Sequence, residues 1–198
     1  MKRLIMQTYI NDGKDRKTVF TYKPFPKMEK LSRQQFKKYA RLNGADYEYY
    51  TPDTGEAHWI RMEMFNRPEY DEVLYVDCDI LIHPGRMKDN IFDYPGQAVN
   101  KVHSFNHWDY PDMNAGVTKW TRAECEIMKE HINEFYHPTH NQDAINKCFK
   151  KYCGEITFLP YRFNVTHRPD KEVVFRHYPG QLKHPLRLKN DPIWRHYK

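Results

Sequence analysis

The sequence predicts an α/β fold in which residues 1–198 form one domain, with a mostly parallel central sheet and helices on both faces. The chain has 198 residues, enough for one domain with a hydrophobic core but few for two. Apolar runs of β-forming residues alternate with segments of helical periodicity, the pattern of a sheet covered by helices. One run, residues 73–76, is continuous and apolar, as expected of a central strand buried on both faces.

We predict the first strand over residues 2–9, with polar side chains following its apolar part. These polar residues are Gln7, Thr8 and Tyr9. In open α/β sheets ligands bind just beyond the carboxyl ends of the strands, which makes all three candidate contacts for a nucleotide. An ordinary exit from strand to loop explains the same residues equally well.

A helix is predicted over residues 32–43, because Ser32 is a favourable first residue and Gly44 follows its last turn. Residues 46–50 then read as a second strand. Residues 59–65 have helical periodicity and carry Arg61.

The second half of the chain continues the alternation of strands and helices. Strands are predicted at residues 98–103, 113–118, 156–159 and 173–177. A helix starts at Arg122, where Thr121 and Glu124 form a capping box. The last long helix covers residues 141–152 and ends before Gly154.

Composition and charge exclude some classes of protein. No stretch approaches the roughly 18 to 20 apolar residues of a membrane span, and the first residues do not form a signal peptide, so we expect a cytoplasmic protein. The cysteines include no CxxC pair, which favours free thiols in a reducing compartment over a zinc site. They are Cys78, Cys125, Cys148 and Cys153.

The net charge of +6 lies in the last quarter of the chain, where residues 151–198 hold 10 Lys and Arg against 4 Asp and Glu. A basic segment attracts nucleic acid, an anionic membrane surface or a phosphorylated substrate, and its sign alone does not choose among them. Residues 186–198 are basic and contain Trp194, and we expect a solvated end with at most weak peripheral contact with a membrane.

Two acids interrupt the apolar segment 72–82, EVLYVDCDILI. Residues two apart in a strand face the same side, so Asp77 and Asp79 are predicted to converge while Cys78 turns into the core. Two carboxylates left unpaired at the end of a buried strand are costly, and hard divalent ions such as Mg2+ or Mn2+ prefer oxygen ligands. The alternative is that one acid caps a loop and the other forms a salt bridge. The flanking apolar runs favour the metal site.

This segment resembles the DxD signature of the GT-A glycosyltransferases, particularly the retaining family-eight group that includes glycogenin and the bacterial lipopolysaccharide galactosyltransferases. Three further segments match that group in the same order. Residues 113–117, MNAGV, resemble its FNAGV segment, and residues 141–143, NQD, resemble its DQD element. Residues 176–185, RHYPGQLKHP, resemble its HxxGxxKP element.

The resemblance implies a metal-dependent enzyme that transfers a hexose from a nucleotide-diphosphate sugar with retention of configuration. UDP-glucose or UDP-galactose is the implied sugar donor, and the acceptor would be a glycan or a lipid-linked sugar. Mn2+ or Mg2+ would be held by Asp77 and Asp79, with His177 as a third ligand. Gly180 would let the backbone approach the diphosphate, and Lys183 would pair with it.

The remaining residues carried over from the resemblance would contact the nucleotide-sugar. Gln142 would lie near the anomeric carbon, and Asp143 would supply the carboxylate for the sugar hydroxyls, because Asn141 replaces the first Asp of the DQD element. The other residues of the implied donor site are Arg61, Cys78, Asn114 and Ala115. The KP pair is split here by His184, and residues 6–9 are also similar to the start of the family-thirty-two mannosyltransferases.

Two other functions remain open from the residues alone. A nucleotidyltransferase that makes sugar nucleotides would share the sheet and the paired acids, but it usually carries a Gly-rich loop after the first strand, and residues 9–17 contain one Gly. A nucleic-acid-binding module would use the basic C-terminal quarter, although no recognised motif supports it and we expect no nucleic-acid partner. Its candidate contacts are Tyr161, Arg162, Phe163, Arg168 and Arg176.

Overall fold

The computed structural model describes residues 1–9, 25–52, 59–100, 113–137, 140–166, 171–179 and 185–197. In this part of the chain a main sheet has the strand order β2-β1-β3-β6-β5. Its strands are β1 (Arg3–Thr8), β2 (Asp46–Tyr50), β3 (Glu72–Val76), β5 (Ala98–Asn100) and β6 (Met113–Thr121). β1 pairs with β2 and β3 in parallel, whereas β6 runs antiparallel to both β3 and β5. Among these five strands β6 alone is reversed, which confirms the predicted mostly parallel sheet.

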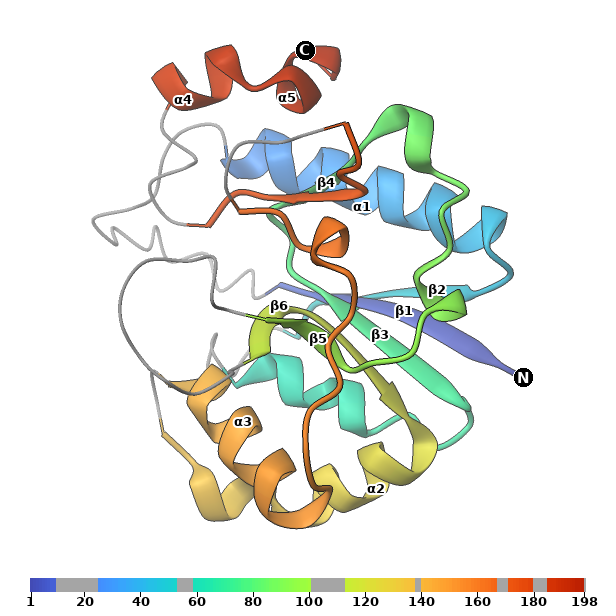
Figure 1. Ribbon diagram of the computed structural model, residues 1–198, viewed down its shortest axis with the longest axis vertical. Coiled ribbons are helices and arrows are strands. Elements are labelled where there is room, and N and C mark those ends of the chain that lie inside the picture. Colours follow the sequence, from blue (N-terminus) through green and yellow to red (C-terminus); the bar gives the residue numbers. More distant parts are fainter. Residues whose placement is uncertain are drawn as a thin grey trace.

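Helices cover both faces of this sheet, as predicted (Figure 1). The helix α1 (Phe25–Leu42) lies on one face. The helices α2 (Arg122–His131) and α3 (Asn141–Tyr152) pack on the other face, together with the 3-10 segments η1 (Ile60–Phe65) and η5 (Ile132–Phe135).

The hydrophobic core is divided by the main sheet, because successive side chains of a strand point to opposite faces. Ile5 of β1 packs with Phe36 of α1, while its neighbours Leu4 and Met6 belong to the core beneath α2 and α3. In that second core Trp120 lies 5.5 Å, between ring centroids, from Phe149 of α3. Apolar side chains therefore pack on both faces of the main sheet, and this packing fixes the positions of the strand ends.

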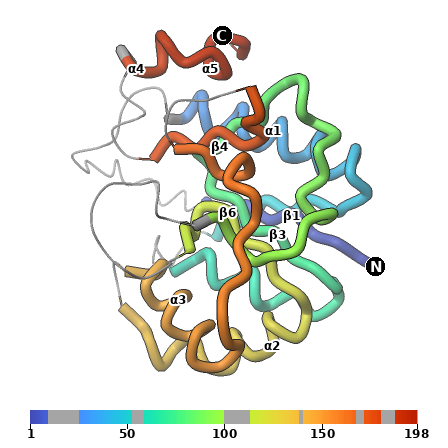
Figure 2. The backbone as a smooth tube through the Cα atoms, in the orientation of Figure 1, coloured from blue at the N-terminus to red at the C-terminus, as the bar shows by residue number. Residues whose placement is uncertain are grey.

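A second, two-stranded sheet packs against α1, and two short helices lie at the top of the backbone trace in Figure 2. The strands β4 (Ile80–Ile82) and β7 (Phe175–His177) pair antiparallel. The helices are α4 (Pro185–Asn190) and α5 (Pro192–His196). Further 3-10 turns are η2 (Pro84–Arg86), η3 (Ile91–Asp93) and η6 (Tyr161–Phe163).

The C-terminal segment differs from the predicted solvated end. Ile193 and Trp194 are buried and pack in a third apolar cluster with Met28 of α1, Leu81 of β4 and Tyr178. The segment is therefore part of the folded structure, because its apolar side chains cover the small sheet. No helix of the described residues has the length and apolar character needed to cross a bilayer.

Several predicted element boundaries are confirmed. α3 has the predicted bounds, and α2 starts with the predicted capping box, in which the Thr121 side chain accepts a bond from the Glu124 amide. α1 ends before Gly44, whose φ of 66° is a left-handed conformation that glycine adopts easily.

Other predicted boundaries are wrong. α1 starts at Phe25, so Ser32 is a buried residue within the helix rather than its first residue, and its Oγ accepts a hydrogen bond from Gln7. Residues 156–159 were expected to form a strand but make only an isolated bridge through Phe158. The predicted strand residues 101–103 lie outside the described part of the chain.

Candidate metal centre

Strand alternation, from which Asp77 and Asp79 were predicted to converge, does not continue through these residues, because a turn joins β3 to β4. The amide of Asp77 still donates to the carbonyl of Gly116 in β6, at 2.9 Å, and the chain then leaves the main sheet. Cys78 and Asp79 form the turn, and Ile80 pairs with His177 in the small sheet. Strand alternation was therefore the wrong reason for placing the two acids together, because the turn is what directs them to the same point.

Three side chains converge where β3 meets β4 and β7. One ligand atom each from Asp77, Asp79 and His177 lies within 4.8 Å of the others. His177 Nε2 is 3.2 Å from Asp79 Oδ1 and 3.9 Å from Asp77 Oδ2. The exposed fraction of the side chains rises from 6% at His177 to 22% at Asp77, so the cluster opens to solvent on the side of Asp77.

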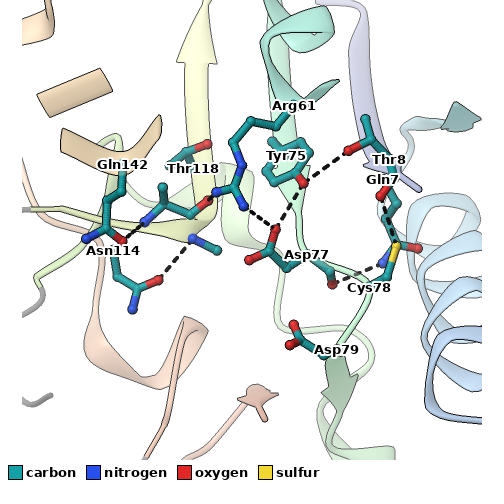
Figure 3. Close-up of polar contacts among 12 residues, drawn as sticks. Gln7, Thr8, Arg61, Tyr75, Asp77, Cys78, Asp79, Asn114, Thr118 and Gln142 are labelled. Carbon is teal, nitrogen blue, oxygen red and sulfur yellow. Dashed lines mark hydrogen bonds and ion pairs between the residues drawn. The ribbon is translucent and has the colours of Figure 1, made fainter. Parts of the chain in front are cut away.

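Asp77 is oriented through one of its two carboxylate oxygens (Figure 3). Its Oδ1 accepts hydrogen bonds from Arg61 Nη2 at 3.1 Å and from the Tyr75 hydroxyl at 2.9 Å. Arg61 is itself fixed, since its Nη1 donates to the carbonyl of Ala115 at 2.9 Å. These contacts leave Oδ2 on the side of His177, so one oxygen of Asp77 positions the group and the other faces the cluster.

The charges around Asp77 perturb its neighbours. Burial lowers the pKa of the Arg61 guanidinium, but the carboxylates of Asp77 and Asp79 outweigh that effect and leave the pKa above its usual value. Burial and the charge of Asp77 raise the pKa of the Tyr75 hydroxyl well above its usual value. Arg61 therefore stays charged and Tyr75 keeps its proton, so both remain hydrogen-bond donors to Asp77.

A chain of hydrogen bonds fixes the tautomer of His177. The Gly116 amide donates to Asn114 Oδ1 at 2.9 Å, so the Asn164 atom that lies 3.0 Å from the same oxygen must be the amide nitrogen. The carbonyl oxygen of Asn164 then faces His177 Nδ1 at 2.9 Å. Nδ1 must carry the proton in this arrangement, which leaves the lone pair of the neutral imidazole on Nε2, pointing at the two carboxylates.

Gly116 provides the space that His177 occupies. A Cβ atom at this position would lie 2.5 Å from His177 Cε1 and 2.9 Å from Nδ1, closer than such atoms can approach. The backbone of β6 and the imidazole ring are therefore in direct contact. Any larger residue at position 116 must displace the ring.

The three side chains fit a divalent cation. Two ligands at right angles on an ion with bonds of about 2.1 Å are separated by about 3 Å, close to the 3.2 Å between His177 Nε2 and Asp79 Oδ1. Carboxylate oxygens suit Mg2+ and Mn2+, and a neutral imidazole is a common further ligand. In the part of the chain that the structure describes, this is the one such group of His, Cys, Asp or Glu side chains.

The three residues predicted at the end of β1 contact protein groups. Gln7 is fully buried; its Nε2 donates to the carbonyl of Asp77 at 3.3 Å, and its Oε1 accepts from the Tyr47 hydroxyl at 2.8 Å. Thr8 Oγ1 lies 3.2 Å from the Tyr75 hydroxyl. Tyr9 is partly buried, and its amide donates to the carbonyl of Tyr50, which extends the pairing of β1 with β2. Their contact with a nucleotide stays a prediction.

Cys78 is buried, as predicted, with its thiol 3.3 Å from the carbonyl of Thr8. Burial, together with the charges of Asp77 and Asp79, raises the pKa of this thiol well above its usual value. The group is therefore a neutral thiol in the native protein. All four cysteines are free thiols in the structure.

Two residues of the predicted NQD element, Gln142 and Asp143, face different sides of α3. Gln142 reaches the site, since its Oε1 accepts a hydrogen bond from the Ala115 amide at 3.0 Å. Asp143 lies on the exposed side of the same helix, with its carboxylate 4.0 Å from His140. The predicted diphosphate contacts Gly180 and Lys183 lie outside the described residues.

Two residues of the site were missed from the sequence. Tyr75 could have been found, because it lies two residues before Asp77 and so shares its side of the strand. No sequence pattern marks Asn164 as a site residue. It lies between η6 and β7, and only the folding of the chain brings it next to His177.

Among the described residues, the candidate nucleic-acid contacts of the basic C-terminal quarter differ in exposure, and Tyr161 is exposed. Arg176 is buried in an ion pair with Asp191, and Phe163 is fully buried. Arg162 lies against the ring of Tyr94, at 4.9 Å from its centroid. Arg168 lies outside the described residues.

Solved structures share the fold of this chain. A glycosyltransferase involved in the glycosylation of the major capsid of PBCV-1 superposes with a TM-score of 0.64 at 15% identity, over 92% of this chain and 95% of that one. The galactosyltransferase LgtC, in complex with donor and acceptor sugar analogues, gives a TM-score of 0.52 at 13% identity over 90% and 87% of the two chains.

A third similar structure is a variant of a Drosophila galactosyltransferase in complex with manganese, UDP-Gal and xylobiose. Its TM-score is 0.51 at 13% identity, over 89% of this chain and 71% of that one. No protein-family model and no curated protein matches the sequence. The structural likeness shows that this chain has the GT-A fold, found in glycosyltransferases.

Proposed function

We propose that this chain is the catalytic domain of a metal-dependent glycosyltransferase that takes a sugar from a nucleotide-diphosphate sugar. The observation that carries the proposal is the group formed by Asp77, Asp79 and His177, whose ligand atoms lie within 4.8 Å of one another in a GT-A fold. Mn2+ or Mg2+ is the proposed ion. The similar Drosophila galactosyltransferase, which was solved with manganese and UDP-Gal, supports this choice.

The site is suited to a diphosphate leaving group. A divalent cation there would supply positive charge to the oxygens of the departing nucleoside diphosphate. The opening of the cluster at Asp77 would let phosphate oxygens reach the ion, while Arg61 and Tyr75 keep that carboxylate in place. In the proposal Gly180 and Lys183 complete the diphosphate site, as the resemblance implies.

The sugar would lie beside the start of β6 and the first turn of α3. Gln142 binds the backbone of Ala115, and this contact joins the two elements that the resemblance assigns to the sugar. We propose a hexose transferred with retention, from UDP-glucose or UDP-galactose, to a glycan or lipid-linked sugar. The bond from the anomeric carbon to the phosphate oxygen breaks, the acceptor oxygen bonds to the same face, and the acceptor proton passes to the departing phosphate.

A screen of sugar donors tests the proposal. The purified protein is incubated with UDP-glucose, UDP-galactose and a set of GDP-sugars in Mn2+, and the release of free nucleoside diphosphate is measured. We expect one UDP-sugar to be turned over above the background without protein, and EDTA to stop the reaction. Absence of turnover with every donor, together with salt-sensitive binding of DNA or RNA, would contradict it.

A further inference from the structure

Asp191, which precedes α5, accepts hydrogen bonds from two different parts of the structure. Its Oδ1 caps α5 by accepting from the amides of Ile193 and Trp194, at 3.0 and 3.1 Å. The same carboxylate binds the segment that carries the metal-site histidine. Oδ2 accepts from Arg176 Nε at 2.9 Å, and Oδ1 accepts from the Tyr178 hydroxyl at 2.8 Å.

Arg176 and Tyr178 are the two neighbours of His177 in the chain. In an extended segment such residues point to the side opposite the residue between them. Both reach Asp191, and His177 points to Asp77 and Asp79. The C-terminal segment therefore holds β7 from behind, directly opposite the metal centre.

Arg176 also connects Asp191 to the second support of the histidine ring. Its Nη1 donates to the carbonyl of Val165 at 2.9 Å, and Val165 in turn accepts the amide of His177 at 3.0 Å. The residue before Val165 is Asn164, whose carbonyl oxygen faces His177 Nδ1. One carboxylate thus fixes both the backbone of the histidine and the residue that sets its tautomer.

The ion pair between Arg176 and Asp191 is well buried, with 6% and 5% of the side chains exposed. Removing one partner of such a pair leaves an uncompensated buried charge, so the other partner must move or draw in water. Here the partner that would move is the residue adjoining His177. A displaced ring would no longer keep Nε2 at 3.2 Å from Asp79.

We propose that Asp191 is a positioning residue for the metal centre, acting through Arg176 and Tyr178 to hold His177 at the distance that cation binding requires. This inference rests on the proposed metal-dependent function. Changes to residues that orient a metal ligand typically weaken metal binding about 10- to 100-fold. Asp191 would therefore set the affinity for the cation without touching the cation or the nucleotide-sugar.

The test compares the wild-type protein with Asp191→Asn and with a matched control, Glu72→Gln. Glu72 accepts from Arg3 Nε at the same distance, 2.9 Å, but lies at the opposite end of β3 from Asp77. Mn2+ binding is measured by calorimetry, and turnover of the UDP-sugar is measured as a function of Mn2+ concentration. We expect Asp191→Asn to raise the dissociation constant and the half-saturating Mn2+ concentration about 10-fold or more, while Glu72→Gln leaves both unchanged.

A merely structural role would give a different result. It would lower the maximal rate, through loss of folded protein, and leave the half-saturating Mn2+ concentration of Asp191→Asn at the wild-type value. That outcome overturns the inference while the proposed function stands. A wild-type protein that binds no Mn2+ overturns both.

A milder variant, Tyr178→Phe, tests the positioning role of Asp191 if Asp191→Asn does not fold. Tyr178→Phe removes a single hydroxyl from Asp191 and keeps the ion pair with Arg176. We expect weaker Mn2+ binding in a protein with the wild-type circular dichroism spectrum. Unchanged affinity in this folded variant overturns the inference.

Discussion

His177 Nε2 lies 3.2 Å from Asp79 Oδ1, although the two residues are far apart in the sequence. They meet because β4 and β7 pair with Ile80 opposite His177, and because the Tyr178 amide donates to the carbonyl of Asp79 at 3.0 Å. The small sheet thus positions one side chain of the metal centre. It brings an imidazole to the carboxylates at the end of the main sheet.

Gly116→Ala is expected to displace His177 and weaken the metal centre. The new Cβ would overlap the imidazole ring, with 2.5 Å to Cε1, and the strand backbone cannot yield without breaking its bond to Asp77. We expect the affinity for Mn2+ to fall about 10-fold or more. Calorimetric titration measures this loss, and Gly85→Ala is the control, because its Cβ would meet only the ordinary contact distance of 3.4 Å. Equal Mn2+ affinities in the two variants would contradict the assigned role of Gly116.

Arg61→Gln should reduce turnover of the nucleotide-sugar by about 10- to 100-fold, because Asp77 loses a donor that fixes its orientation. Arg67→Gln is the matched control, since Arg67 follows the same 3-10 segment and pairs with Glu48 at 2.7 Å, away from the cluster. Steady-state rates at saturating Mn2+ are compared. A rate for Arg61→Gln equal to that of the control would show that Arg61 does not support Asp77.

Asn164→Ala removes the acceptor that holds the proton on His177 Nδ1. In the wild-type protein, nitrogen NMR of labelled histidine should show His177 with its proton on Nδ1, and Asn164→Ala should weaken Mn2+ binding about 10-fold. Assignment of the resonance uses His177→Gln. A wild-type His177 whose Nδ1 carries no proton would contradict the hydrogen-bond chain from Gly116 through Asn114.

The cysteine thiols should react slowly in the native protein. Burial raises the pKa of Cys125 and of Cys148 to about 12 and that of Cys153 to about 11, and Cys78 is raised well above its usual value. Thiolate, the reactive form, is therefore scarce at pH 8 and increases only as the pH rises toward these values. Labelling with Ellman's reagent before and after unfolding in urea measures the difference. Fast labelling of the native protein at pH 8 would contradict the expected protection.

Local sequence patterns predicted most of the secondary structure correctly. The capping box of Thr121 and Glu124 marks the start of α2, and α3 has the expected bounds because apolar spacing and Gly154 define them. One failure has a clear cause, which is that tertiary pairing overrode the local pattern. Strand alternation was expected to hold through Asp77 and Asp79, yet β3 and β4 belong to different sheets because β7 supplies the partner for β4.

The candidate site was predictable only where a motif carries its own chemistry. Asp77 and Asp79 were identifiable as a pair of acids, and His177 came from a resemblance rather than from its spacing. Asn164 and Asp191 could not have been found, because each acts through hydrogen bonds between segments that the sequence does not connect. Trp194 was expected in solvent, and its burial depends on the small sheet beneath it.

Asp79→Asn should lose the release of UDP from the UDP-sugar in the presence of Mn2+, compared with the wild-type protein. The substitution keeps the shape of the side chain and removes the charge that a cation needs. Asp89→Asn is the control, because Asp89 forms a partly exposed ion pair with Arg86 at 3.3 Å. We predict that Asp79→Asn abolishes turnover while its circular dichroism spectrum and Tm show a folded protein, and that Asp89→Asn turns over at the wild-type rate. Mn2+-dependent turnover that persists in folded Asp79→Asn would show that Asp79 is not a ligand of a catalytic cation.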